Sequence, residues 1–152
     1  MSNIKGHNFA DEVEEARRGT CYCLALRQAS RRLLRLYDRK LSEQGLTIGQ
    51  FGMLGFISGT EEYTVQALAD FLDMNQSALS RGLAPLEKQG FLVSKSDPDD
   101  GRKRILELTP LGAGRLNEAS KSWKSAQQEL SEKNKELDID SLMQTIAQLG
   151  AV

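Results

Sequence analysis

Residues 64–108, TVQALADFLDMNQSALSRGLAPLEKQGFLVSKSDPDDGRKRILEL, decide the fold of this chain. Thr64 precedes one apolar pattern at helical spacing, and Asn75 precedes a second that stops at Gly90. Both are residue types that cap helix N-termini. The Asp73–Met74 step makes a tight break between the two patterns. Two short helices joined by a turn of about three to four residues predict a helix-turn-helix.

The period of the pattern changes after this second helix. Residues 91–93 and 105–108 have the apolar runs of short strands, and residues 97–104 between them are a polar turn rich in turn formers. Strand, charged loop and strand directly after a helix-turn-helix predict a small two-stranded β wing. Pro85 lies within the second helix and removes one backbone hydrogen bond, so we expect a bend or a local break there.

Longer amphipathic patterns lie on both sides of this winged region. A helical apolar face runs over residues 17–41, and Thr47 opens a further helix with a capping box. Thr109 opens a helix that ends at about Lys133, with Pro at its first position, and a last helix covers about residues 140–149. The fold class we expect is mainly α.

Length and composition indicate one globular domain over residues 1–152. The 39% apolar and 27% charged shares are ordinary for a soluble protein, and no apolar run approaches the roughly 20 residues of a membrane span. No secretory signal is visible at the N-terminus, and two cysteines two positions apart are no disulfide framework, so we expect a cytoplasmic protein. The 20 basic and 21 acidic residues give a net charge of −1, so any DNA binding must come from a local patch.

Four segments together are typical of one family. They are the helix at 64–72, the helix at 75–90 with its LSRGLAPLEKQGFL ending, the DPDDGRKR wing and the LELTPLGAGRL that follows it. With these segments the chain resembles the MarR family of transcriptional regulators over about residues 20–150.

The resemblance implies a winged helix-turn-helix homodimer. About residues 17–44 and 110–152 would be N- and C-terminal dimerisation helices, and about residues 46–108 the winged helix-turn-helix. Each recognition helix would enter a major groove of a pseudo-palindromic double-stranded DNA operator, and each wing would reach a minor groove. Many members of the family are repressors that a small ligand or thiol oxidation releases from DNA.

Short polar or basic side chains occupy the first two turns of the second helix, where a recognition helix faces base edges and phosphates. The wing adds basic residues near a glycine, and the family pattern places an acid and an arginine at Asp100 and Arg102. We expect Asp100 to direct the Arg102 guanidinium. A solvated helix face and an ordinary charged turn are the alternatives. The candidate DNA contacts are Asn75, Gln76, Ser77, Ser80, Arg81, Asp100, Arg102, Lys103 and Arg104.

The redox candidates are Cys23, Cys21 and Tyr37. Residues two apart on an intact helix point about 200° from each other, so the two cysteines cannot pair there, and no metal site is expected. The resemblance places Cys23 at the reactive position of the organic-hydroperoxide-sensing branch, with Tyr37 at one partner position. Arg27 and Ile48 stand where that branch has tyrosines. The alternative is that Cys23 is a small buried apolar residue and Cys21 an incidental surface residue.

A basic face along the first long helix is the candidate effector region. It could line a site for a small anionic or aromatic effector, or pair with the acidic segment at residues 11–15 as a solvated face. Its members are Arg17, Arg18, Arg27, Arg31, Arg32, Arg35, Arg39 and Lys40.

The sequence therefore predicts a sequence-specific DNA-binding transcriptional regulator. The alternative from another class is a winged-helix protein–protein adaptor without DNA binding, since fold alone does not fix function. An enzyme is not expected, because His7 is the one histidine and no catalytic motif is present. No cofactor is expected either.

Overall fold

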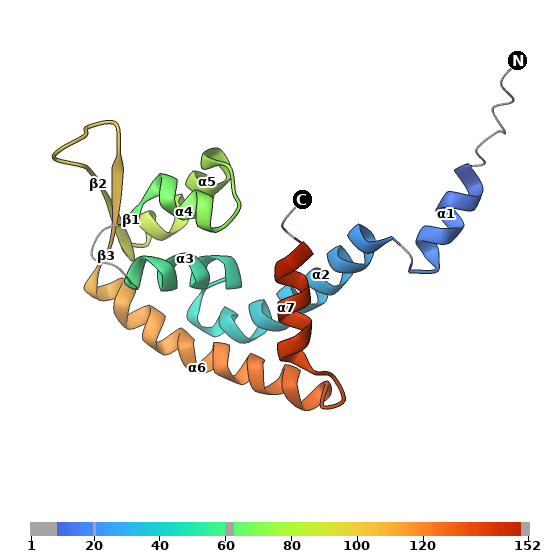
Figure 1. The fold of residues 1–152 in the computed structure, drawn as a ribbon. Coiled ribbons are helices and arrows are strands. Elements are labelled where there is room, and N and C mark those ends of the chain that lie inside the picture. Colours follow the sequence, from blue (N-terminus) through green and yellow to red (C-terminus); the bar gives the residue numbers. More distant parts are fainter. Residues whose placement is uncertain (1–8, 20, 60–62, 150–152) are drawn as a thin grey trace, which may run out of the picture. The chain divides into compact units, whose positions relative to one another are not determined.

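The computed structural model describes residues 9–19, 21–59 and 63–149. The chain divides into two compact units, Met1–Leu36 and Tyr37–Val152. In chain order the elements are α1 (Phe9–Arg17), α2 (Tyr22–Leu41), the 3-10 turn η1 (Ser42–Gln44), α3 (Ile48–Ser58), β1 (Tyr63–Thr64), α4 (Val65–Phe71), α5 (Gln76–Lys88), β2 (Leu92–Ser96), β3 (Arg104–Leu108), α6 (Pro110–Lys133) and α7 (Ile139–Leu149) (Figure 1).

The N-terminal unit contains two helices where the sequence predicted the start of one. α1 ends at Arg17, and Gly19 has a left-handed backbone with φ of 82°. The predicted helix start at Arg17 was therefore wrong, because a left-handed residue cannot continue an α-helix. The Cys21 carbonyl accepts from the Ala25 amide at 3.0 Å, so Cys21 lies immediately before α2 and Cys23 lies within its first turn.

Local capping opens the helices of the C-terminal unit as the sequence predicted. Thr47 and Gln50 make both bonds of a capping box at α3, and the Thr64 hydroxyl accepts from an amide of the first turn of α4. Asn75 and Thr109 cap α5 and α6 in the same way. The turn before α5 contains Asp73 with φ of 50°, a conformation that aspartate tolerates better than most residues.

The core of this unit lies where the helices meet the sheet. Leucines from α2 to β3 are 0–2% exposed there, which is the degree of burial expected for the centre of a domain. The fully buried large side chains are Leu41, Leu54, Ile57, Leu68, Leu79, Leu86, Leu92 and Leu106.

The wing belongs to a three-stranded antiparallel sheet in the order β1-β3-β2. β3 pairs with β2 from Arg104 opposite Ser96 to Leu108 opposite Leu92. The third strand, β1, pairs Tyr63 with Leu106 and was not predicted, because two residues carry too little pattern to indicate a strand. The first wing strand also lies further along the chain than residues 91–93.

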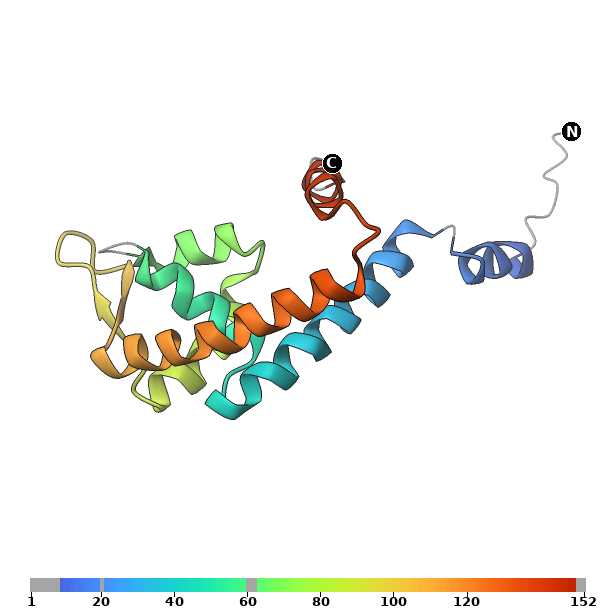
Figure 2. The same cartoon turned by 90° about the horizontal axis from the view of Figure 1, so that it is seen from below.

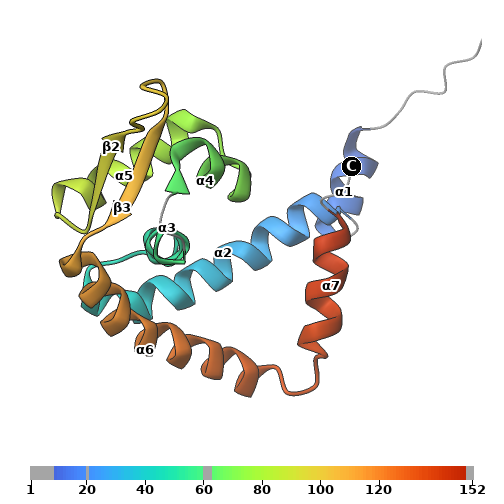
Figure 3. The same cartoon turned by 60° about the vertical axis from the view of Figure 1, so that its left-hand side comes forward.

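The long helices follow the predicted limits closely. α6 is uninterrupted to Lys133 (Figure 2), and α7 follows after a short connection at residues 134–138 (Figure 3). α5 continues through Pro85 to Lys88, so the helix is kept and, of the two expected effects of Pro85, the local break does not occur. Among the described residues, none of the helices combines the length and apolar character that a membrane crossing requires.

Candidate nucleic-acid interface

The start of α5 presents polar side chains on the side opposite the core. The Asn75 side-chain oxygen accepts from the Ala78 amide at 2.8 Å and so fixes the first turn. Leu79 and Leu83 face the core at 0% and 4% exposure, and this burial sets the rotation of the helix. The exposed residues of the first two turns are Gln76, Ser77, Ser80 and Arg81, all of them predicted contacts.

An open cavity of about 600 Å³ lies between α5 and the wing. One side is formed by the start of α4 and by α5, and the other by β2, β3 and the wing turn between these strands, which are labelled in Figure 1. The predicted contacts that line it are Gln76, Ser80, Arg102, Lys103 and Arg104. Asn75, Ser77, Arg81 and Asp100 do not line it. We call this cavity the α5–wing groove.

The wing turn is built by two aspartates that bind backbone amides. The Asp97 carboxylate accepts from the amides of Asp99 at 2.8 Å and Asp100 at 3.3 Å. Asp100 in turn accepts from the Arg102 backbone amide at 3.1 Å and lies 3.8 Å from the Lys103 ammonium. Asp100 therefore orders the backbone of Arg102, and the expected contact with its guanidinium is replaced by the contact with Lys103.

The three basic residues of the wing have different degrees of freedom. Arg104 belongs to β3, and its Nε donates to the Ser94 hydroxyl at 2.6 Å, so its guanidinium is held against β2. Lys103 is paired with Asp100. Within the described part of the chain, the Arg102 guanidinium makes no ion pair, which leaves its charge available to a phosphate or a narrow minor groove.

Gln66 is a groove residue that the sequence analysis did not predict. Gln66, in the first turn of α4, lines the α5–wing groove and bonds both Asp70 and Gln76. The available signal was an exposed polar residue two positions after the Thr64 cap. The predicted contacts were confined to the second helix and the wing, so they did not include Gln66.

Comparison with known proteins identifies the family. The family model described as MarR family matches residues 44–103, from the turn before α3 to the wing. The transcriptional regulator MosR of M. tuberculosis, solved in complex with DNA, has the same fold with a TM-score of 0.78 and 30% sequence identity. That match covers 86% of this chain and 94% of MosR. The chain belongs to the MarR family.

Two curated relatives agree with this membership of the MarR family. A putative transcriptional regulatory protein for the hcr operon of Thauera aromatica is 33% identical over 73 residues, which cover 48% of this chain and 44% of that protein. The uncharacterised HTH-type transcriptional regulator YdcH of Bacillus subtilis (strain 168) is 33% identical over 96 residues, which cover 60% of this chain and 65% of that protein. The chain spans less than two thirds of the length of either relative.

The redox candidates of this MarR-family chain are divided between its two units. Cys21 is half-buried and Cys23 is exposed, so the alternative of a buried Cys23 does not describe the single chain. Cys21 and Cys23 belong to the N-terminal unit, and Tyr37 belongs to the C-terminal unit. Its hydroxyl donates to the Gln127 side chain at 2.8 Å, and burial raises its pKa. His7 lies outside the described residues.

The basic residues of the candidate effector region are partly paired with acids. Arg17, the last residue of α1, and Arg18 lie 3.9 Å and 3.6 Å from Glu14, as the solvated-face alternative expected. In the last turn of α2, Arg39 and Lys40 approach the Glu129 carboxylate.

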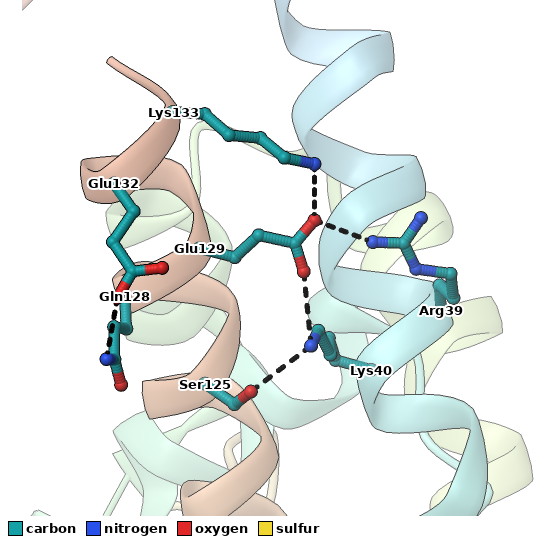
Figure 4. A network of polar contacts seen from close by, with 7 residues as sticks. All are labelled: Arg39, Lys40, Ser125, Gln128, Glu129, Glu132 and Lys133. Carbon is teal, nitrogen blue, oxygen red and sulfur yellow. Dashed lines mark hydrogen bonds and ion pairs between the residues drawn. The ribbon is translucent and has the colours of Figure 1, made fainter. Parts of the chain in front are cut away.

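Glu129 on α6 is the centre of that second cluster (Figure 4). Its carboxylate lies 2.7 Å from Lys133, 3.1 Å from Lys40 and 3.0 Å from Arg39. Hydrogen bonds from Lys133 and then Lys40 lower the pKa of Glu129 from 4.5 to about 2. The cluster joins the last turns of α2 to α6, so these cations stabilise the fold.

Proposed function

We propose that this MarR-family protein is a homodimeric transcriptional regulator that binds a pseudo-palindromic double-stranded DNA operator in a sequence-specific way. The observation that carries the proposal is the α5–wing groove, which places the exposed first turns of α5 opposite Arg102 and Lys103. First turns of a recognition helix contact base edges in the major groove, and an inserted arginine suits a minor groove. MosR, a relative of 30% identity, is solved with DNA.

Apolar side chains support assembly with a second copy of the chain. In α7 they recur at three- and four-residue steps and are 40–59% exposed, a pattern that predicts burial against another helix. The first part of α2 exposes a second set to 39–45%. The residues are Leu142, Met143, Ile146 and Leu149 in α7, and Leu24, Leu26, Leu33 and Leu34 in α2.

Two recognition helices of a dimer must sit about 34 Å apart to enter successive major grooves. An effector that favours another separation shifts the population away from DNA. We propose that the protein is a repressor and that a small anionic or aromatic ligand, or oxidation of a thiol, releases it. Cys23 is the thiol to test first, because it is exposed.

Fluorescence anisotropy of the reduced protein on labelled duplexes tests the proposal. Duplex from the region upstream of the gene is compared with scrambled duplex, and a pool of randomised duplexes supplies any other operator. Arg102→Ala should weaken binding about tenfold and reduce the slope against salt by about one. Lys124→Ala is the matched control, because Lys124 is exposed on α6 and does not line the groove.

Three results separate the possibilities. Release by an organic hydroperoxide that disappears in Cys23→Ser supports thiol control. Specific binding that peroxide leaves unchanged directs the search to anionic aromatic ligands. Failure to prefer any duplex sequence, with equal loss in Arg102→Ala and Lys124→Ala, refutes the regulator and favours the adaptor.

A further inference from the structure

A chain of three hydrogen-bonded side chains joins α4 to α5 at the α5–wing groove. The Gln66 amide nitrogen donates to the Asp70 carboxylate at 2.6 Å, one helical turn away. The Gln76 amide nitrogen donates to the Gln66 amide oxygen. Gln66 and Gln76 both line the groove, and all three residues are exposed. The order of the chain is therefore Gln76 to Gln66 to Asp70.

Hydrogen-bonding capacity alone sets the direction of this chain. An ionised carboxylate only accepts, so Gln66 must turn its NH2 group toward Asp70. The Gln66 carbonyl oxygen then faces Gln76, which must turn its own NH2 group toward Gln66. In an exposed glutamine the two amide orientations are otherwise nearly equivalent. The carboxylate of Asp70 thus selects one of them at Gln76, a residue it does not touch.

The selected orientation leaves a definite pattern on Gln76. Among the described residues, its carbonyl oxygen has no partner and its NH2 group retains one free N–H. In the major groove, adenine presents an N6 amino donor beside the N7 acceptor, which matches this pair of groups. Cytosine presents an amino donor alone, whereas guanine and thymine present only acceptors at the corresponding edge.

We propose that Asp70 and Gln66 are positioning residues that make Gln76 a reader of bases with a major-groove amino group, adenine above cytosine. This inference rests on the proposed function and deepens it, because it assigns a base preference to one position of each operator half-site. The position of Asp70 is unfavourable for an acid, both within α4 and beside DNA. It lies in the last turn of α4, where the helix dipole disfavours an acid, and beside the surface proposed to face phosphates.

A purely structural role remains the competing explanation, since a Gln–Asp pair four residues apart stabilises a helix slightly. Base preference separates the two explanations. Asp70→Asn lets residue 70 donate as well as accept, so Gln66 and Gln76 can turn over. In the double variant Gln66→Glu with Asp70→Asn, the amide is at position 70 and the carboxylate at position 66. The amide at position 70 donates to the carboxylate at position 66, which can only accept hydrogen bonds. The double variant therefore restores the orientation of Gln76 with a different pair of side chains.

The experiment selects duplexes from a randomised library with wild-type protein and then measures dissociation constants on single-base changes. Gln76→Ala identifies the position that Gln76 reads, as the one where preference disappears. Glu87→Gln is the control for charge, because Glu87 also lines the groove and its change adds the same unit of charge as Asp70→Asn. Thermal unfolding by circular dichroism checks that every variant is folded.

We expect adenine at the base pair that Gln76 reads. Binding should weaken when this adenine is replaced by the unsubstituted base purine, which lacks the N6 amino group. Asp70→Asn should reduce discrimination at that position about tenfold and leave the other positions unchanged. The double variant should recover the preference, and Glu87→Gln should keep it while raising affinity for all sequences. Guanine or thymine at that position, or an unchanged preference in Asp70→Asn, overturns the inference while the regulator stands. Failure of the wild type to select any sequence overturns both.

Discussion

Substitution of Gly112 by alanine tests how α6 is fixed to the sheet. Gly112 is buried in the first turn of α6, and a Cβ built there would lie 1.9 Å from the Phe91 carbonyl oxygen and 2.9 Å from a methyl of Leu108. The Phe91 oxygen is backbone and accepts from the Thr109 amide at 3.0 Å, so it cannot swing aside as a side chain would. The start of α6 must move away by roughly 1.5 Å to restore ordinary contact.

That movement acts on the bonds that anchor the helix. Thr109 donates its hydroxyl to the Gly90 carbonyl at 2.6 Å and accepts from the Gly112 amide at 3.0 Å. Overpacking a tight site destabilises by about 1–3 kcal/mol, and each weakened hydrogen bond adds about 1 kcal/mol. The better helix propensity of alanine returns about 1 kcal/mol. Gly112→Ala should therefore lower the free energy of unfolding by about 3 kcal/mol.

Urea unfolding at one fixed protomer concentration measures the effect, since association contributes to the stability of a dimer. With a slope of about 2 kcal/mol per molar urea, the midpoint should fall by about 1.5 M. Gly114→Ala is the matched control, because Gly114 lies on the same helix, is exposed, and has no atom within 4 Å of the added Cβ. It should gain about 0.5–1 kcal/mol. Equal midpoints for the two variants would refute the reasoning.

Three further predictions follow from single contacts. Asn75→Ala should lose the α5 cap and about 1 kcal/mol of stability, whereas Asn75→Asp should keep the cap and weaken duplex binding. Urea unfolding measures the stability and anisotropy measures the binding. Equal losses of stability in the two variants contradict the prediction. Gly82→Ala should stay within about 1 kcal/mol of wild type, because the added Cβ meets only the flexible end of Met53; a loss as large as that of Gly112→Ala would be inconsistent with this. The pKa of Glu129 is lowered from 4.5 to about 2, so its contribution to stability is complete above about pH 4.5 and disappears as the pH falls toward 2. Glu129→Gln should flatten this part of the pH profile of the urea midpoint. An unchanged profile argues against the Lys133–Glu129–Lys40 cluster.

The helix starts could be predicted because capping is local. Thr47, Thr64, Asn75 and Thr109 each accept from an amide three residues ahead, so the residue type and a short apolar pattern suffice to place them. The exposed contacts on α5 follow from the same step, because the cap and the buried leucines together fix which side chains face outward.

Two features that the sequence did not predict depend on contacts that no local pattern shows. β1 exists because Tyr63 and Thr64 meet β3, and nothing within two residues announces a strand. The partner of Asp100 could not be read from spacing, since turn geometry directs its carboxylate to the Arg102 amide and to Lys103. The break before α2 is different, because Gly19 is visible in the sequence and the expected helical stretch from Arg17 nevertheless ran across it.

The interface also resolves how a chain of net charge −1 can face DNA. Three of the acids at or beside the α5–wing groove are engaged with neighbours: Asp97 binds two wing amides, Asp100 binds an amide and Lys103, and Asp70 binds Gln66. Each carboxylate orders a group of the proposed DNA interface, while Arg102 keeps its charge unpaired within the described residues. Of the basic candidate contacts, only Lys103 is paired with an acid within the described residues, so Arg81, Arg102 and Arg104 keep charge for phosphates. Binding should therefore weaken as the salt concentration rises, and selectivity among sequences must come from the side chains that α5 presents to base edges.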